Sequence, residues 1–168
     1  MLALGVTLLP LRLLMALLCI VLSTGLAMIG TRGLSRQQLD AAPFTGWRVW
    51  LLRLICCLLR IMFWCAGFRV RVRGEKAAPQ EAPILAMAPH STFFDVLAVA
   101  VMDAPSVVAK AGVAQVPGWG KLVQMTQPIL VDRSDPNSRH NTIKQITDRA
   151  EGAENPGWQQ VELISPAL

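Results

Sequence analysis

An uncharged stretch of nineteen residues, Leu13 to Thr31, limits the possible folds of this chain more than any other feature. A helix of about 20 apolar residues crosses the ~30 Å hydrocarbon core of a bilayer, so this stretch is long enough to span one. A cleaved signal peptide is the alternative, because Gly25-Leu26-Ala27 loosely resembles a small-residue cleavage site. Arg12 is the single cation ahead of the stretch, and leucines before it lengthen the apolar run, which favours a retained anchor over residues 1–33.

A second apolar stretch, from Trp47 to Phe68, contains three arginines and is therefore a poor membrane span. An arginine at the centre of a span costs about 2.5–3.5 kcal/mol. Arg53 and Arg60 are nearly two helical turns apart and share a face, while tryptophans mark both ends of the stretch. The pattern predicts an interfacial or re-entrant amphipathic helix region over residues 34–68, with its arginines at lipid phosphates. A buried helix whose arginines extend to solvent is the alternative.

The net charge of +5 is concentrated between Arg48 and Lys76, beside the two apolar stretches. Such a basic strip suits the anionic headgroups of membrane lipids. No recognition motif accompanies the charge, so nucleic acid is not an expected partner. The cysteines lack metal-ligand spacing, and they predict neither a metal site nor a disulfide framework, which suits a domain facing the cytosol. All of them lie inside the two apolar stretches: Cys19, Cys56, Cys57 and Cys65.

The remainder of the chain alternates short apolar runs with helical patterns, which is typical of an α/β domain. The runs predict strands at residues 68–74, 84–88, 106–110, 127–131 and 158–164, the first of them half-buried near a sheet edge. Helices are predicted at residues 93–102, 116–125 and 135–152. The last helix is expected to have Ser134 or Asp135 as its N-cap, Pro136 in its first turn, and Gly152 at its end.

An apolar run also contains a histidine and an aspartate, His90 and Asp95, separated by Ser-Thr-Phe-Phe. On one regular helix these side chains would point about 140° apart and could not meet. They can meet if His90 follows a strand and Asp95 lies in the first turn of the next helix, with Ser91 or Thr92 as N-cap. The carboxylate would then orient the imidazole as a general base that deprotonates a hydroxyl group. The alternative is a capping box of Thr92 and Asp95, which leaves His90 an ordinary loop residue.

Three consecutive stretches, "APHSTFFD", "VVAKAGVAQVPGWGKLVQ" and "PILVDRSDPNSR", resemble the glycerophospholipid acyltransferases. Within that superfamily the chain is most similar to the lysophosphatidylcholine acyltransferases. The segments "LLPLRLLMALL" and "GWRVWLLRL" also resemble the membrane-associated N-terminal region of that subfamily. The resemblance covers about residues 1–160. It implies an α/β fold in which N-terminal membrane helices precede an incomplete glycerolipid acyltransferase-type domain, residues 69–168.

The resemblance also implies the chemistry of the His-Asp pair. His90 would be the general base and Asp95 its orienting partner, in acyl transfer from acyl-CoA to the free hydroxyl of a lysophospholipid, first of all lysophosphatidylcholine. Acyl-CoA would be a co-substrate, with no bound cofactor or metal, and membrane lipid would be a partner. The endoplasmic reticulum is the location that the resemblance implies, with the domain facing the cytosol. The oligomeric state is left open.

Four further site residues follow from the same resemblance. Lys110, Pro117 and Gly120 match the family's second block, which shapes the acceptor pocket. Arg133 matches the arginine that holds the substrate's phosphate, and a guanidinium suits phosphate oxygens because it can bind two of them at once.

The chain departs from the family at its third motif, "FPEGT", where it reads "GWQQVELISPAL". Pro166 is present, but no glutamate-glycine pair follows it, and Glu162 lies earlier in the expected strand. The chain thus resembles the N-terminal part of such an enzyme. Half of the pocket would be missing and the last strand would be unpaired, so low or absent activity is expected. The alternative is a non-catalytic, membrane-anchored fragment that binds lipid or the full-length enzyme.

Overall fold

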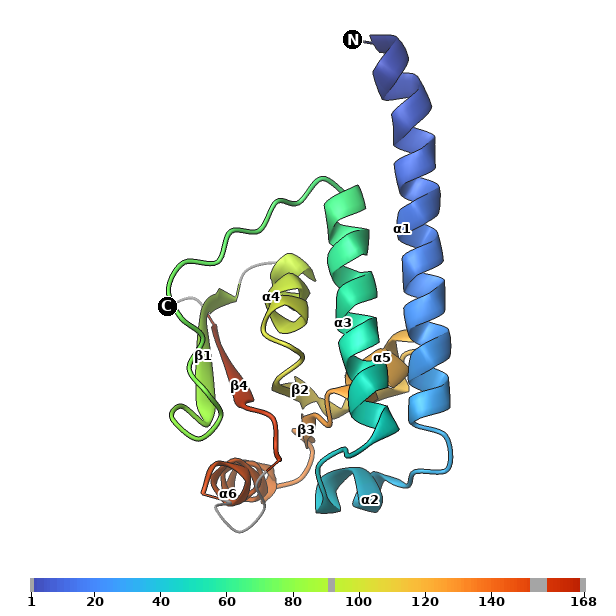
Figure 1. Ribbon diagram of the computed structural model, residues 1–168. Helices are drawn as coiled ribbons and strands as arrows, with labels where there is room; N and C mark the ends of the chain where they lie inside the picture. The colour runs from blue at the N-terminus through green and yellow to red at the C-terminus, as the bar shows by residue number, and fades with distance from the viewer. Residues whose placement is uncertain (1, 91–92, 152–156, 167–168) are drawn as a thin grey trace.

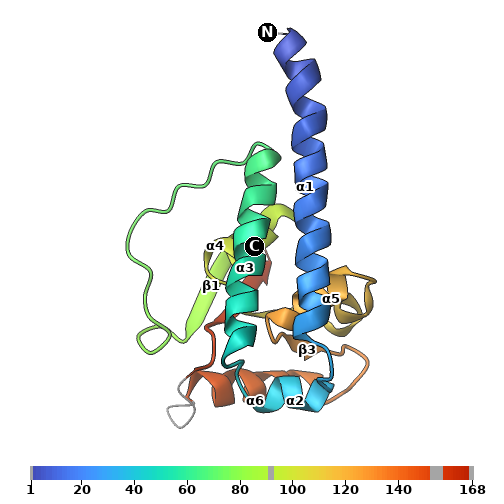
Figure 2. The same cartoon turned by 45° about the vertical axis from the view of Figure 1, so that its right-hand side comes forward.

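The computed structural model describes residues 2–90, 93–151 and 157–166 (Figure 1). The first helix, α1, spans Leu2–Gly30 and therefore begins well before the uncharged stretch that predicted it. Within the described residues, one helical segment, Leu8–Gly30, is long and apolar enough to cross a membrane. A second helix, α3 (Trp47–Cys65), lies beside α1 and runs in the opposite direction (Figure 2). Between them, α2 (Arg36–Ala41) begins with a capping box formed by Ser35 and Gln38.

The two halves of α1 have different surroundings. Its C-terminal half is buried along a stripe of small side chains spaced by four residues, and these small groups let α3 approach closely. The N-terminal half projects beyond the other elements (Figure 1), and its leucines from Leu8 to Leu14 are exposed. The buried stripe consists of Cys19, Ser23, Ala27 and Thr31.

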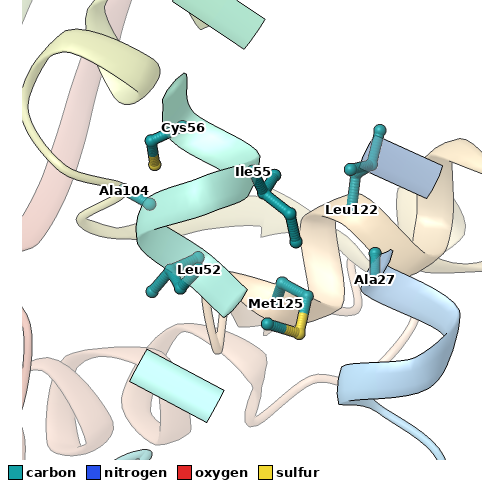
Figure 3. Close-up of a cluster of buried hydrophobic side chains, with 7 residues drawn as sticks. All are labelled: Ala27, Leu52, Ile55, Cys56, Ala104, Leu122 and Met125. Carbon is teal, nitrogen blue, oxygen red and sulfur yellow. The ribbon is translucent and has the colours of Figure 1, made fainter. Parts of the chain in front are cut away.

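The hydrophobic core lies where α1, α3 and α5 (Trp119–Met125) meet (Figure 3). Met125 is completely buried there, and a side chain at Gly30 would come within 2.7 Å of its sulfur atom. Full burial of each large aliphatic side chain stabilises the fold by about 1.5–3 kcal/mol. The core cluster consists of Ala27, Leu52, Ile55, Cys56, Ala104, Leu122 and Met125.

The sheet has four parallel strands in the order β1-β4-β2-β3, which confirms the α/β class. The last strand of the chain, β4, was expected to be unpaired, and that expectation is wrong. It lies in the middle of the sheet, where Val161 is opposite Ile84 on one side and Ser106 on the other. The strand bounds are β1 Ile84–His90, β2 Ser106–Lys110, β3 Ile129–Val131 and β4 Val161–Pro166.

Helices follow the strands at the predicted places, but the caps of the last helix differ. That helix, α6, spans Ser138–Ala150 and has Asn137 at its N-cap position, so Ser134 and Asp135 are not its caps. The carboxylate of Asp135 instead accepts a hydrogen bond from the backbone N–H of Asn137 at 2.9 Å, which forms a turn ahead of the helix. The predicted end at Gly152 lies outside the described residues. The other helical segments are η1 Phe93–Asp95, α4 Val96–Val101 and η2 Ala111–Gln115.

The strand predicted at residues 68–74 is absent. This segment runs from α3 to β1 without pairing to the described sheet, and Val70 and Val72 are 48% and 65% exposed. Alternating residues specify an extended chain, but a strand also needs a neighbour to bond to. Within the described sheet β1 is an edge strand whose partner is β4.

The arginines of α3 were expected at lipid phosphates, and for two of them the structure shows partners inside the protein. Arg48 donates to the carbonyl of Gly30, the last residue of α1, at 3.1 Å. Arg60 donates to the carbonyls of Ala100 and Val101 at 2.8 and 3.0 Å. Carbonyls at a helix C-terminus lack partners within the helix, so cations satisfy them well.

Candidate active site

The carboxyl ends of the strands meet at one edge of the sheet because all strands are parallel. His90 ends β1, Lys110 ends β2, and Arg133 follows the end of β3 by two residues. The strand order places His90 at one side of this edge and Arg133 at the other. Neighbouring strands are about 4.8 Å apart, so three intervals separate the two backbones by about 14 Å. Open α/β sheets bind their ligands at this edge, which makes it the candidate active site.

His90 is still part of β1, whereas the sequence predicted it in the loop beyond. Its partner across the strands is Pro166 of β4, after an irregularity in the pairing between Met87 and His90. The His90 side chain lies outside the described part of the structure, as do Ser91 and Thr92. The predicted N-cap and the alternative capping box therefore also lie outside it.

Asp95 lies in the turn between β1 and α4, at the N-cap position of α4 and just before the first helical turn in which it was predicted. It ends η1, directly precedes α4 and is partly buried, and its side chain makes no capping hydrogen bond to α4. Aromatic packing holds this turn, because the ring of Phe94 lies 4.9 Å from that of Phe68, which in turn packs 5.6 Å from Phe63. The strand-turn-helix order thus agrees with a His-Asp pair, and the roles of both residues stay predictions.

The second block, which includes Lys110, Pro117 and Gly120, connects β2 to α5. Lys110 and Pro117 are exposed, and Gly118 turns the chain with a positive φ of 71°. Gly120 is buried, and an added Cβ would collide with the carbonyl oxygen of Ala114 in η2. Close packing of α5 on η2 therefore requires glycine at position 120. The binding roles of the three residues stay predictions.

The loop after β3 holds Arg133 between two turns. Asp132 accepts hydrogen bonds from the backbone N–H and the hydroxyl of Ser134, at 2.9 and 2.6 Å. These bonds, that of the hydroxyl first, hold the pKa of Asp132 below its usual value. Arg133 is exposed and borders a shallow groove of about 540 Å³ along the start of α6.

A second arginine on this groove was not singled out from the sequence. Arg139, in the first turn of α6, lines the same groove as Arg133. The sequence signal that could have revealed Arg139 is its position. Acidic residues are preferred near a helix N-terminus, so an arginine in the first turn is unusual there. Two guanidinium groups at a helix N-terminus suit an anionic group such as a phosphate.

Among the residues that the structure describes, metal-binding groups do not gather at this edge of the sheet. Across the described residues, no three or more His, Cys, Asp or Glu side chains are close enough to hold a metal ion. All four cysteines are free thiols. Glu162 is buried near the start of β4, away from the carboxyl edge.

The parallel sheet and the residues at its carboxyl edge agree with the result of comparison. Residues 69–158 match the Acyltransferase family, and the chain belongs to that family.

Its relatives include a lysophosphatidylcholine acyltransferase of Drosophila melanogaster, which is 39% identical over 96% of this chain. Lysophosphatidylcholine acyltransferase 2 of Homo sapiens is 42% identical over 97% of the chain, and lysophosphatidylcholine acyltransferase 1 of Danio rerio is 41% identical over 95%. The chain spans 29–30% of the length of these relatives. The resemblance predicted from the three motifs is confirmed. No solved structure shows significant similarity to the chain.

Proposed function

We propose that this chain takes part in acyl transfer from acyl-CoA to the free hydroxyl of a lysophospholipid, with lysophosphatidylcholine as acceptor. The observation that carries the proposal is the position of His90 and Asp95 around the turn between β1 and α4, at the carboxyl edge of a parallel sheet. The names of the relatives support the acceptor, because each of those reported is a lysophosphatidylcholine acyltransferase.

In the proposed reaction His90 takes the proton of the acceptor hydroxyl while the oxygen attacks the thioester carbonyl. A new carbon–oxygen bond forms, the carbon–sulfur bond breaks, and coenzyme A leaves as a thiolate that takes the proton from the imidazolium. Asp95 orients the imidazole and stabilises its protonated form. No covalent acyl-enzyme is needed, because the hydroxyl attacks the thioester directly.

The acceptor's phosphate would bind at the other side of the carboxyl edge. Arg133 and Arg139 line one groove there, and their charges complement a phosphate. Holding the phosphate at that side would direct the glycerol hydroxyl along the edge, towards the end of β1.

The membrane is the proposed location, through α1. Its exposed N-terminal half is apolar, and Leu8–Gly30 is long enough to span a bilayer. Trp47, Trp50 and Trp64 are exposed, and each has an arginine guanidinium 4.6–5.3 Å from its ring centroid, a combination that suits the headgroup region. We place the chain at the endoplasmic reticulum, with the sheet domain facing the cytosol, where free thiols persist.

The test is transfer of a labelled acyl group from acyl-CoA to lysophosphatidylcholine, in membranes that contain the chain. A His90→Ala variant is expected to lose about 10²–10⁴-fold of the rate, the usual contribution of a general base. An Asp95→Asn variant should also be slower, because the imidazole loses its orienting charge.

The matched control is His140→Ala, since His140 is exposed on α6 and far along the chain from the proposed base. Its rate should equal that of the unaltered chain. An unaltered rate for His90→Ala would contradict the general-base role. A chain that is present in the membrane but transfers no acyl group would contradict the proposed function itself.

A further inference from the structure

A groove outside the candidate active site lies between the end of α3, the outer side of α4 and the extended segment at residues 68–72. It has a volume of about 420 Å³. Figure 1 shows this segment leaving the end of α3 and passing α4 on its way to β1. We call this hollow the α3–α4 groove.

The walls of the α3–α4 groove are mainly apolar and aromatic, and the guanidinium of Arg60, which also lines it, is bonded to the end of α4. Phe63 and Trp64 of α3 form one wall, and Leu97 and Val101 of α4 form another. Trp64 is 55% exposed and Phe63 is buried, so the groove has a solvent-exposed rim and a buried floor. An alkyl chain placed along this floor would gain about 0.8 kcal/mol for each CH₂ group removed from water.

A cation lies on the rim of the groove. Arg69 stacks on Trp64, with its guanidinium carbon 4.6 Å from the ring centroid. The two hydrogen bonds described for Arg69 both use Nη1, which donates to the carbonyls of Trp64 and Phe68 at 2.9 and 3.0 Å. These contacts fix the position of the guanidinium. A fixed guanidinium beside an apolar channel complements a phosphate joined to an acyl chain.

The groove also extends from the proposed membrane surface to Phe68, which packs against the turn that holds Asp95. The end of α3 that it borders is the end beside the exposed half of α1 (Figure 2). At its inner side, Phe68 lies 4.9 Å from Phe94, the residue immediately before Asp95.

We propose that the α3–α4 groove receives a lysophospholipid from the bilayer, with its phosphate at Arg69 and its acyl chain against Phe63, Leu97 and Val101. The lipid then passes Phe94 to reach the candidate active site. This inference rests on the proposed function, because it supplies the acceptor of that reaction.

The test measures binding without chemistry. The chain, in phosphatidylcholine vesicles and without acyl-CoA, is exposed to lysophosphatidylcholine that carries a photoactivatable diazirine in its acyl chain. Covalent labelling is mapped by mass spectrometry and followed against lipid concentration. Labels are expected on residues 61–72 and 94–101.

Two variants with the same charge change separate the groove from general attraction to lipid. Arg69→Gln should raise the lysophosphatidylcholine concentration for half-maximal labelling about tenfold, which corresponds to about 1.4 kcal/mol. Arg71 is exposed in the same extended segment but does not line the groove. Arg71→Gln should therefore change that concentration by less than about twofold, as is usual for an exposed surface charge.

A third variant, Leu97→Trp, fills the floor of the groove and should abolish labelling there while circular dichroism shows an unchanged fold. Labels confined to α1, equal effects of Arg69→Gln and Arg71→Gln, or undiminished labelling of a folded Leu97→Trp chain would each overturn the inference.

Acyl transfer is measured separately with acyl-CoA added. Specific labelling without any transfer would leave the groove in place and refute the proposed function. Transfer that is equally fast in all three variants would refute the groove alone.

Discussion

At the scale of single residues, Asp103 connects three segments that are distant in sequence. Its carboxylate pairs with Arg60 of α3 at 2.7 Å and with Lys76, in the loop that leads to β1, at 2.9 Å. Its backbone, like that of Ala104, has a positive φ, so the turn after α4 is a strained one that these contacts hold. Burial raises the pKa of Asp103, but the hydrogen bonds and charges of Lys76 and Arg60 outweigh burial and hold the pKa below its usual value.

This lowered pKa predicts a loss of stability in acid. The folded state binds the proton of Asp103 less readily than the unfolded state, so the stabilisation is complete above the ordinary pKa of 3.8 and declines as pH falls below it. Asp103→Asn removes the charge and still tolerates a positive φ. We expect the variant to be less stable at pH 6, by about 0.2–1 kcal/mol for each exposed pair. The difference should shrink towards pH 3.

The measurement is the free energy of unfolding in denaturant, at several pH values, in a mild detergent. Asp148→Asn, an exposed change on α6, serves as the control and should follow the unaltered chain at every pH. A constant difference between the Asp103→Asn chain and the unaltered chain from pH 6 to pH 3 would contradict the charge effect.

At the scale of elements, the amide of Gln127 is one of the groups that dock α2 on the sheet domain, beside Arg36 and Arg149. Gln127 is 1% exposed, and its side-chain nitrogen donates to the carbonyls of Leu39 and Ala42, both at 2.8 Å. Its side-chain oxygen accepts from the backbone N–H of Phe44 at 3.0 Å. The side chain of Gln127, which lies between α5 and β3, thus bonds three backbone groups in and just after the end of α2.

Replacing this amide is expected to loosen α2. Gln127→Leu keeps a similar volume but leaves three backbone groups with no partner, and each such group costs about 1–3 kcal/mol when it stays buried. We expect hydrogen exchange at residues 36–44 to become much faster, while the amides of β2 change little. The control is Gln37→Leu, because Gln37 is an exposed glutamine on α2 itself. Unchanged protection of residues 36–44 in Gln127→Leu would contradict this role.

These elements show what the sequence could predict and what it could not. The apolar runs at 84–88 and 106–110 predicted strands correctly, because continuous apolar runs are typical of parallel strands, although Ile84 and Ala86 of the edge strand β1 are exposed. The pattern at 68–74 was misleading, since alternation says nothing of whether a partner strand exists. The contact between Gln127 and Leu39 joins residues 88 positions apart, and no local pattern contains it.

The candidate site, too, could be predicted from the sequence only in part. The pattern predicted His90 at the end of a strand, and the family resemblance implied Arg133 as a site residue. The structure places both backbones at the carboxyl edge of the sheet. The strand order that separates them depends on β4 inserting between β1 and β2, which is a tertiary event. Arg139 joins Arg133 because the turns at Asp132 and Asp135 reverse the loop, and spacing alone does not reveal this.

At the scale of the whole molecule, α1 belongs to two environments, and this predicts two separable defects. Leu14 is 62% exposed in the projecting half, whereas Ala27 is fully buried against α3 and α5. Leu14→Lys should weaken binding to phosphatidylcholine vesicles by about 2.5–3.5 kcal/mol and leave the domain folded. Ala27→Leu should keep vesicle binding but destabilise the fold by about 1–3 kcal/mol, because the packed stripe has no room for a larger side chain.

Vesicle flotation and denaturant unfolding, each applied to both variants, check this separation. A Leu14→Lys chain that unfolds as readily as Ala27→Leu would show that the projecting half also supports the domain. An Ala27→Leu chain of unaltered stability would show that the stripe is loosely packed.

The central position of β4 has a consequence for how the protein is made. Among the described strands, β4 leaves the ribosome last, yet β1 and β2 meet only through it. During synthesis β1 therefore has no partner strand until β4 is made. The exposed apolar surface of α1, in contrast, is present from the start of synthesis. Until Val161 to Pro166 are translated, the edges of β1 and β2 that β4 covers have no partner, so we expect the incomplete sheet to be most prone to pairing with other chains at that stage.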